Sequence, residues 1–231
     1  MRRLEWDSGF WNVDVWEIEE ADSFYLSGVP DIAPAGRGRY LIQALVPITE
    51  IHKIGLLEKA GFSFAESKIT LRKPVKELSV TDTGNIRKVE KSEIELYKDI
   101  FYGMYGNVSR YELFPPKKIN EFYCTWVSKS IDCILDDTCV GYYDDGHLAG
   151  FITYKCRDNK AVVGLIGVFP QFQKKGISQK LLGYLNNDAM HAGLDEIVIS
   201  TQGVNLKAIN SFIKSGFLFD SIHHWYYKKN W

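Results

Sequence analysis

One passage constrains the fold of this chain more than any other: a run of apolar residues that leads through a proline and a glycine into an amphipathic helix. Residues 165–178 read LIGVFPQFQKKGIS. The apolar residues 161–169 predict a buried strand that Pro170 ends, because proline has no N–H to donate to a sheet. Residues 178–191 then repeat leucine and alanine at helical spacing. A buried strand followed closely by such a helix indicates an α/β fold.

The loop between this strand and this helix has the composition of an anion-binding turn. A helix N-terminus offers unpaired N–H groups and the positive end of the helix dipole. Gly176 lets a ligand approach the backbone, Lys174 and Lys175 add positive charge, and Ser178 is small. These features predict a pyrophosphate cradle, although the loop has neither the GxxxxGK[ST] nor the GxGxxG signature. An ordinary strand-to-helix turn with a solvated basic face is the alternative.

A polar, turn-rich segment at 78–85 (LSVTDTGN) predicts a boundary between two domains, residues 1–80 and 84–231. In the first domain we expect a Pro- and Gly-rich loop at 28–38, a strand at 40–46 and a helix at 49–60. In the second we expect helices at 92–101, 117–131, 178–191 and 206–215. Strands are expected there at 138–143, 148–154, 161–169 and 196–201, with a final strand pair at 217–222 and 225–229. A capping box of Ser92 and Glu95 is expected to open the first of these helices.

Two short segments of the chain read alike. Residues 57–67 (LEKAGFSFAES) and 212–221 (FIKSGFLFDS) both combine a helix end, a glycine and a strand with Phe at alternate positions. This similarity favours two related halves. Chance similarity of a common helix-glycine-strand ending is the other explanation.

Charge and composition exclude several classes of function. The 28 basic and 29 acidic side chains give a net charge of −1, which argues against a nucleic-acid partner. The longest apolar run, 161–169, is too short to cross a bilayer, and the N-terminal MRRLEWDSGFW does not read as a signal peptide. The four cysteines show neither CxxC spacing nor a zinc pattern, so we expect free thiols, no metal site and a cytoplasmic protein.

The same passage resembles a motif of the GCN5-related N-acetyltransferases (GNAT), written V-x-P followed by Q/R-x-x-G-x-G/A. Val168 and Pro170 match the first part, and 173–178 match the second. Residues 205–217 (NLKAINSFIKSGF) resemble the later N-x-x-A…Y-x-x-x-G-F passage of the family. The resemblance implies a GNAT fold, a mixed, mostly antiparallel sheet flanked by helices. It also implies that acetyl-CoA is the co-substrate.

The resemblance also implies where acetyl-CoA would lie. The strand 161–169 would splay from its neighbour, and its backbone at Ile166, Gly167 and Val168 would hold the pantetheine arm as an added strand would. Asn205 matches an Asn that contacts the cofactor arm. The backbone amides of the loop would bind the pyrophosphate; the residues concerned are Gln173, Lys174, Lys175, Gly176, Ile177 and Ser178.

The chain departs from the family at the positions of the general acid and the general base. The family's general-acid Tyr aligns with Phe212, which cannot donate a proton. Either water assists the leaving thiolate, or Ser211 or Tyr226 replaces the Tyr, or the protein binds acyl-CoA without efficient turnover. The strand 161–169 carries no carboxylate to serve as the base. This absence favours an amino sugar over a lysine, because the amine of an amino sugar has a lower pKa than the lysine value near 10.4.

A closer resemblance, to the TDP-fucosamine acetyltransferases, begins at the N-terminus with L-x-W-D-S-x-F-W. Those enzymes acetylate the 4-amino group of TDP-4-amino-4,6-dideoxygalactose, and they have a small N-terminal domain that looks like a degenerate copy of the acetyltransferase fold. The resemblance implies a nucleotide-sugar acceptor, a role in cell-envelope polysaccharide synthesis and a homodimer. The segment 102–116 would line the acceptor site, with Arg110 on the diphosphate and Tyr111 or Phe114 on thymine. A surface arginine and core aromatics are the alternative there.

Three functions are therefore open at this point. The first is acetylation of a nucleotide sugar. The second is acetylation of another amine, such as a peptide N-terminus or an antibiotic. The third is a non-catalytic acyl-CoA-binding module, which the phenylalanine at position 212 motivates.

Overall fold

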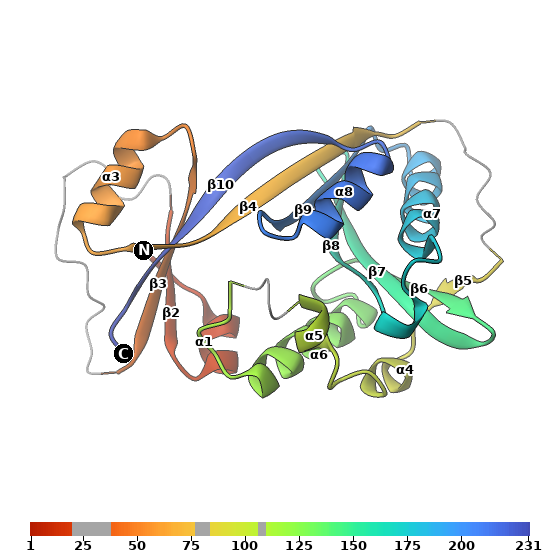
Figure 1. The fold of residues 1–231 in the computed structure, drawn as a ribbon, viewed down its shortest axis with the longest axis horizontal. Helices are drawn as coiled ribbons and strands as arrows, with labels where there is room; N and C mark the ends of the chain where they lie inside the picture. The colour runs from red at the N-terminus through yellow and green to blue at the C-terminus, as the bar shows by residue number, and fades with distance from the viewer. Residues whose placement is uncertain (20–37, 77–83, 106–109) are drawn as a thin grey trace. The chain divides into compact units, whose positions relative to one another are not determined.

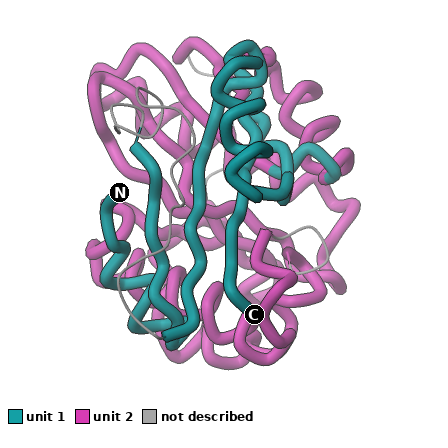
Figure 2. Tube along the Cα trace, turned by 90° about the vertical axis from the view of Figure 1, so that its left-hand side faces the viewer, with its two compact units in different colours: residues 1–69, 202–204, 221–231 teal, residues 70–201, 205–220 magenta. Residues whose placement is uncertain are grey.

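The computed structural model describes residues 1–19, 38–76, 84–105 and 110–231, which form two compact units (Figures 1 and 2). Unit 1 contains Met1–Ile69, Gln202–Val204 and Ser221–Trp231; unit 2 contains Thr70–Thr201 and Asn205–Asp220. The units do not follow the expected division at residue 80, because strands β4 (Ser63–Pro74) and β10 (Leu218–Lys229) contribute residues to both. Most of the expected loop at 28–38 and of the expected boundary at 78–85 lies outside the described residues.

Unit 1 is built on strands in the order β1-β2-β3-β10-β4. Strands β1, β2 and β3 span Arg2–Arg3, Asp14–Ile18 and Tyr40–Pro47, respectively. The unit also contains helices α1 (Glu5–Trp11) and α3 (Ile51–Lys59). Strand β3 is parallel to β2 and antiparallel to β10. Its alternating apolar side chains anchor a core that comprises Ile18, Ile42, Ala44, Val46, Leu57, Ala60, Phe62 and Tyr226.

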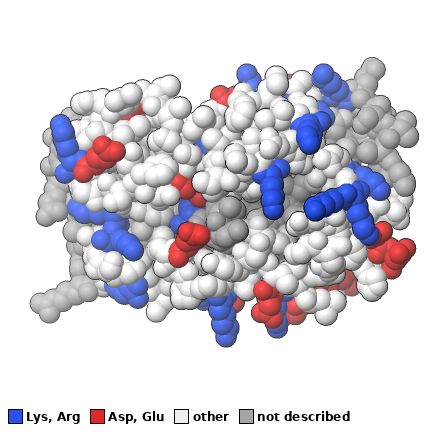
Figure 3. All heavy atoms as spheres, viewed as in Figure 1, with Lys and Arg blue, Asp and Glu red and all other residues white. Residues whose placement is uncertain are grey.

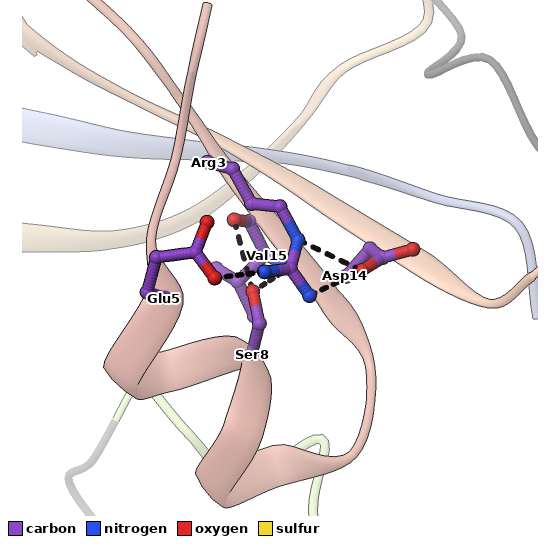
Figure 4. A network of polar contacts seen from close by, with 5 residues as sticks. All are labelled: Arg3, Glu5, Ser8, Asp14 and Val15. Atoms are coloured by element: carbon purple, nitrogen blue, oxygen red, sulfur yellow. Dashed lines mark hydrogen bonds and ion pairs between the residues drawn. The ribbon is translucent and has the colours of Figure 1, made fainter.

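The N-terminal segment is fixed by a polar network (Figure 4). The Arg3 guanidinium donates to Asp14 Oδ1 at 3.0 and 2.8 Å, and it also contacts the Glu5 carboxylate. The Ser8 hydroxyl, on α1, accepts a hydrogen bond of 2.9 Å from the Val15 amide. Ser8 is buried, so this hydroxyl satisfies a backbone group that water does not reach. The conspicuous N-terminal motif therefore has at least a structural role.

Unit 2 contains the strand order β10-β4-β9-β8-β7-β6-β5. The sheet is mixed, because β6, β7 and β8 pair antiparallel whereas β8 and β9 pair parallel. Helix α7 packs on β6, β7 and β8, and α4, α5 and α6 lie on the other side of these strands (Figure 1). The strands are β5 (Ile86–Lys88), β6 (Thr138–Asp144), β7 (His147–Arg157), β8 (Lys160–Val168) and β9 (Glu196–Gln202). The helices are α4 (Lys91–Glu95), α5 (Phe101–Tyr105), α6 (Pro116–Ile131), α7 (Ile177–His191) and α8 (Leu206–Lys214).

Two sequence predictions about this unit are wrong. The capping box pairs Glu90 with Glu93 rather than Ser92 with Glu95, and the helix it opens is the short α4, with α5 following separately. The expected final strand pair is a single strand, β10. Its residues 223–229 pair without interruption with β3, and this pairing excludes a turn at His223.

The repeated helix-glycine-strand ending is confirmed as local structure. Gly61 and Gly216 both have positive φ, 80° and 87°, and each follows a helix. The next residue in each case, Phe62 or Phe217, donates back to a carbonyl five residues earlier, as in a Schellman motif. Gly193 ends α7 in the same way. Because three helices share this ending, it does not by itself indicate related halves, and the degenerate N-terminal copy stays a prediction.

None of the helices among the described residues is long and apolar enough to span a membrane. Cys124, Cys133, Cys139 and Cys156 all lie in the described part of the chain and are free thiols.

Candidate active site

Strand β8 separates from its neighbour β9 along part of one edge. Its parallel pairing with β9 runs from Lys160↔Glu196 to Val162↔Val198. Both strands continue past this point, β8 to Val168 and β9 to Gln202. The pairing of β8 with β7 on the other side extends to Val168. The expected splay of this strand from its neighbour is therefore present, and residues 163–168 have one edge without a ladder partner among the described residues.

The backbone groups of Ile166 and Val168 face this edge. Phe169 N–H donates to Ala149 across the β7 ladder at 3.0 Å, and alternation along an antiparallel pair then directs Gly167 towards β7 and its two neighbours away from it. Two side chains confirm the direction. The Tyr105 hydroxyl donates to the Ile166 carbonyl at 2.8 Å, and the Gln173 side-chain amide donates to the Val168 carbonyl at 3.2 Å.

A bulge shapes the strand just before this edge. The register between β7 and β8 shifts between Ile152 and Tyr154, and the Leu165 amide donates to the buried Thr153 hydroxyl at 2.9 Å instead of to a carbonyl. The bulge removes one backbone partner from the ladder, and the threonine hydroxyl supplies a replacement. Thr153 was not predicted from the sequence, because its contact with β8 depends on the register of two strands.

The carboxylate of Asp136 lies against β8, a strand that has no Asp or Glu of its own. Asp136 is buried, and it accepts hydrogen bonds from Ser130 Oγ at 2.7 Å and from Trp126 Nε1 at 3.3 Å. A Cβ added at Gly164 would lie 2.4 Å from one of its oxygens, so only glycine fits there. Because Asp136 precedes β6 in the sequence, no local pattern associated it with β8.

The loop before α7 contains two residues with left-handed backbone conformation. Lys174 and Gly176 both have positive φ, 65° and 74°. Gly176 is the N-cap of α7 and no side chain caps the helix there, so the first amides of the helix stay available. Among the described residues, a Cβ at Gly176 would meet only Gln179 Oε1, at 3.9 Å, so these residues leave the space in front of this glycine open.

Basic side chains gather over the face of unit 2 that carries α7 and α8 (Figure 3). Lys175 forms an ion pair of 2.7 Å with Asp144, whose hydrogen bond raises the pKa of the lysine. Lys180 donates to the Tyr142 hydroxyl at 2.7 Å. The charge that we expected Lys175 to supply is thus already paired with an acid of the β6–β7 hairpin.

Helix α8 brings further predicted residues next to the start of α7. Asn205 is its N-cap and accepts the Ala208 amide at 3.2 Å. The Ser211 hydroxyl lies 3.2 Å from the Ser178 hydroxyl, in the first turn of α7. Phe212 is buried and its ring packs against Phe217.

The remaining predicted residues have local partners. Tyr226 belongs to unit 1, and its hydroxyl donates to Glu58 at 3.1 Å. The Arg110 guanidinium lies over the Tyr111 ring and donates to its hydroxyl. Tyr111 and Phe114 are 7% and 8% exposed, which favours the core interpretation of these two rings over stacking on a base.

The comparisons with known proteins agree with this geometry. Residues 101–217, slightly more than half of the chain, match the profile of the Acetyltransferase (GNAT) family. The chain belongs to the GNAT family. As a member, it is an acetyl-CoA-dependent N-acetyltransferase. The GNAT fold predicted from the sequence is thereby confirmed, as is acetyl-CoA as co-substrate.

Individual relatives add detail. The dTDP-fucosamine acetyltransferase of Escherichia coli O6:H1 is 22% identical over 228 residues, which cover 97% of this chain and 96% of that protein. A GCN5-related N-acetyltransferase from Sphaerobacter thermophilus has a TM-score of 0.58 at 16% identity, over 85% of this chain and 62% of that one. A GNAT acetyltransferase from Colwellia psychrerythraea has a TM-score of 0.54 at 18% identity, over 80% and 64%. The chain spans less than two thirds of these two solved structures, and their likeness shows the fold alone.

Proposed function

We propose that this acetyltransferase acts on the 4-amino group of a TDP-linked 4-amino-4,6-dideoxyhexose. One observation carries the proposal: the similarity to the E. coli dTDP-fucosamine acetyltransferase extends over 97% of the chain, whereas the family profile matches only residues 101–217. The relative therefore also resembles the first hundred residues. A shared catalytic domain alone does not explain that similarity.

The residues at the β8 edge fit acetyl-CoA. The pantetheine arm would pair with the edge-facing groups of Ile166 and Val168, on either side of Gly167, as an added strand pairs with a sheet edge. The pyrophosphate would take the uncapped amides of 173–178, and Asn205 would contact the arm from the start of α8. A phosphate at this helix terminus is favoured by the unpaired N–H groups and by the helix dipole together.

The transfer follows from these positions. The neutral amine attacks the thioester carbonyl, and an edge-facing backbone N–H of β8 polarises the carbonyl oxygen where negative charge develops. The C–S bond breaks and the thiolate leaves; its conjugate thiol has a pKa near 8.5, so it can leave without a general acid, and the proton lost by the nitrogen reaches it through water. Phe212 supplies no proton. Of the two hydroxyls that could replace the missing Tyr, Ser211 lies in the same unit as β8.

Arg110 would pair with the diphosphate of the nucleotide sugar, because a guanidinium matches phosphate oxygens in charge and shape. Tyr111 and Phe114 would support Arg110 from the core rather than stack on the thymine. We extend the proposal to a cytoplasmic homodimer in cell-envelope polysaccharide synthesis, and light scattering on the purified protein tests the dimer.

The experiment for the acceptor is thiol release from acetyl-CoA with TDP-4-amino-4,6-dideoxyhexoses of both C4 configurations. A lysine peptide is the control acceptor. Release with one epimer supports the proposal and assigns the stereochemistry. Release with the peptide and with neither sugar contradicts it and favours acetylation of another amine.

A further inference from the structure

A tyrosine that the mechanism above does not use reaches the exposed edge of β8. Tyr105 ends α5, and its hydroxyl donates to the Ile166 carbonyl at 2.8 Å. That carbonyl belongs to the edge along which the acetyl-pantetheine arm would pair. The hydroxyl oxygen therefore lies beside the strand where the thioester would be held.

The position of this hydroxyl is enforced by its surroundings. A Cβ added at Gly167 would lie 2.4 Å from the Tyr105 hydroxyl oxygen and 2.6 Å from Met104 Cε, so only glycine leaves room for these side chains. The ring packs against Tyr123 of α6, with centroids 4.7 Å apart. A side chain confined in this way loses little further freedom when a substrate arrives.

The hydrogen-bonding capacity of the phenol decides its partner. A hydroxyl has one proton to donate and two lone pairs to accept with. Here Ile166 takes the proton, so the oxygen offers only acceptor capacity to a ligand. The thioester carbonyl requires a donor and gains nothing from such an oxygen. The acceptor amine carries N–H groups and matches it.

We propose that the Tyr105 hydroxyl accepts an N–H of the acceptor amine and orients the nitrogen towards the thioester. The inference rests on the acetyltransferase activity and deepens the proposed function. The amine nitrogen bonds to the carbonyl carbon, the C–S bond breaks with its electron pair on sulfur, and the proton lost by nitrogen reaches the sulfur through water. Tyr105 orients the amine without taking this proton. Burial raises the pKa of its phenol far above the ordinary value, and the phenol stays neutral throughout.

The test compares Tyr105→Phe with a matched control, Tyr97→Phe. The Tyr97 hydroxyl also donates to a strand carbonyl, that of Leu148 on β7, at 2.9 Å. Each variant removes one hydroxyl and keeps the ring. The assay measures thiol release with the amino sugar as the varied substrate, together with the Kd for acetyl-CoA.

We expect Tyr105→Phe to lower kcat/KM for the amine about 10- to 150-fold, the range for a hydrogen bond to a group that becomes charged, with an unchanged Kd for acetyl-CoA. Tyr97→Phe should change neither value. A second readout needs no turnover: in the presence of CoA, the wild type should bind the amino sugar more tightly than its 4-deoxy counterpart, which has no donor at that position, and Tyr105→Phe should lose this preference.

Unchanged kinetics in Tyr105→Phe, or an equal loss in both variants, overturns the inference. If the wild type acetylates neither sugar epimer, the proposed acceptor fails, and the same comparison is made with the amine that the wild type does acetylate. A tenfold or larger loss confined to Tyr105→Phe then supports the inference independently of the sugar.

Discussion

Gly176 is the N-cap of α7, and a substitution there tests the proposed pyrophosphate cradle separately from the stability of this helix. Its φ is 74°, and an alanine there would adopt a left-handed conformation at a cost of about 1–2 kcal/mol. The added methyl group would also project into the space before the α7 amides, where Gln179 is its near neighbour in the described part of the chain. The replacement should therefore both destabilise the protein and hinder a ligand that approaches these amides.

Gly193, at the other end of the same helix, is the matched control. Its φ is 68°, and a Cβ there would meet no atom of the described residues within 4 Å. Gly193→Ala should cost a similar amount of stability, a fall in Tm of about 2–8 °C for each variant. Only Gly176→Ala should weaken acetyl-CoA binding, by about 10- to 150-fold if one charge-assisted hydrogen bond is lost.

Calorimetric titration with acetyl-CoA gives the Kd of each variant, and thermal unfolding gives the Tm. Both variants stay folded at the titration temperature, because the expected loss is small beside a typical stability of about 5–15 kcal/mol. A Kd for Gly176→Ala equal to that of the wild type would refute the cradle. An equal loss of affinity in Gly193→Ala would show that destabilisation of α7, and not obstruction, is the cause.

Three further predictions follow from burial and hydrogen bonding. Phe212→Tyr should lower stability by about 1–3 kcal/mol without raising kcat, since the ring is buried and the substitution brings a polar hydroxyl into an apolar position; a large rise in kcat would show that the ring edge faces the thiol. Ser8→Ala should cost about 1–3 kcal/mol in denaturant unfolding, because the Val15 amide loses its acceptor, and an unchanged midpoint would contradict this. Burial opposes ionisation of Glu93, but hydrogen bonds from Tyr143 and the backbone lower its pKa below the ordinary value. The contribution of the Glu93 carboxylate to folding stability is therefore fully present above about pH 4.5, and it is lost as the pH falls through the lower, folded-state pKa. Glu93→Gln should therefore destabilise the protein at neutral pH and not in strong acid, as pH-dependent unfolding would show.

The features of the fold and site that the sequence predicted are those with local signals. The passage through Pro170 and Gly176 specifies a strand end, an open loop and a helix start within a few residues, and the structure places all three there. The β6–β7 hairpin was predictable for the same reason, since Asp145 and Gly146 adopt the positive φ that its turn requires.

The features that could not be predicted from the sequence depend on distant partners. Asp136 meets β8 through the order of the strands, and Tyr105 meets Ile166 from 61 residues away. The continuity of β10 depends on β3, about 180 residues earlier, and overrides the expected break between the strands at 217–222 and 225–229. Hydrophobic periodicity and turn residues carry no information about such pairings.

The most direct test of the account is a competition for acetyl-CoA in one reaction. The two TDP-4-amino-4,6-dideoxyhexose epimers and a lysine peptide are mixed with the wild-type protein, and mass spectrometry with chromatographic separation measures each acetylated product against free CoA. The account predicts that one N-acetylated sugar epimer accumulates in proportion to the thiol released, with the peptide unmodified. Thiol release matched by acetylated peptide, with both sugars unchanged, would contradict it.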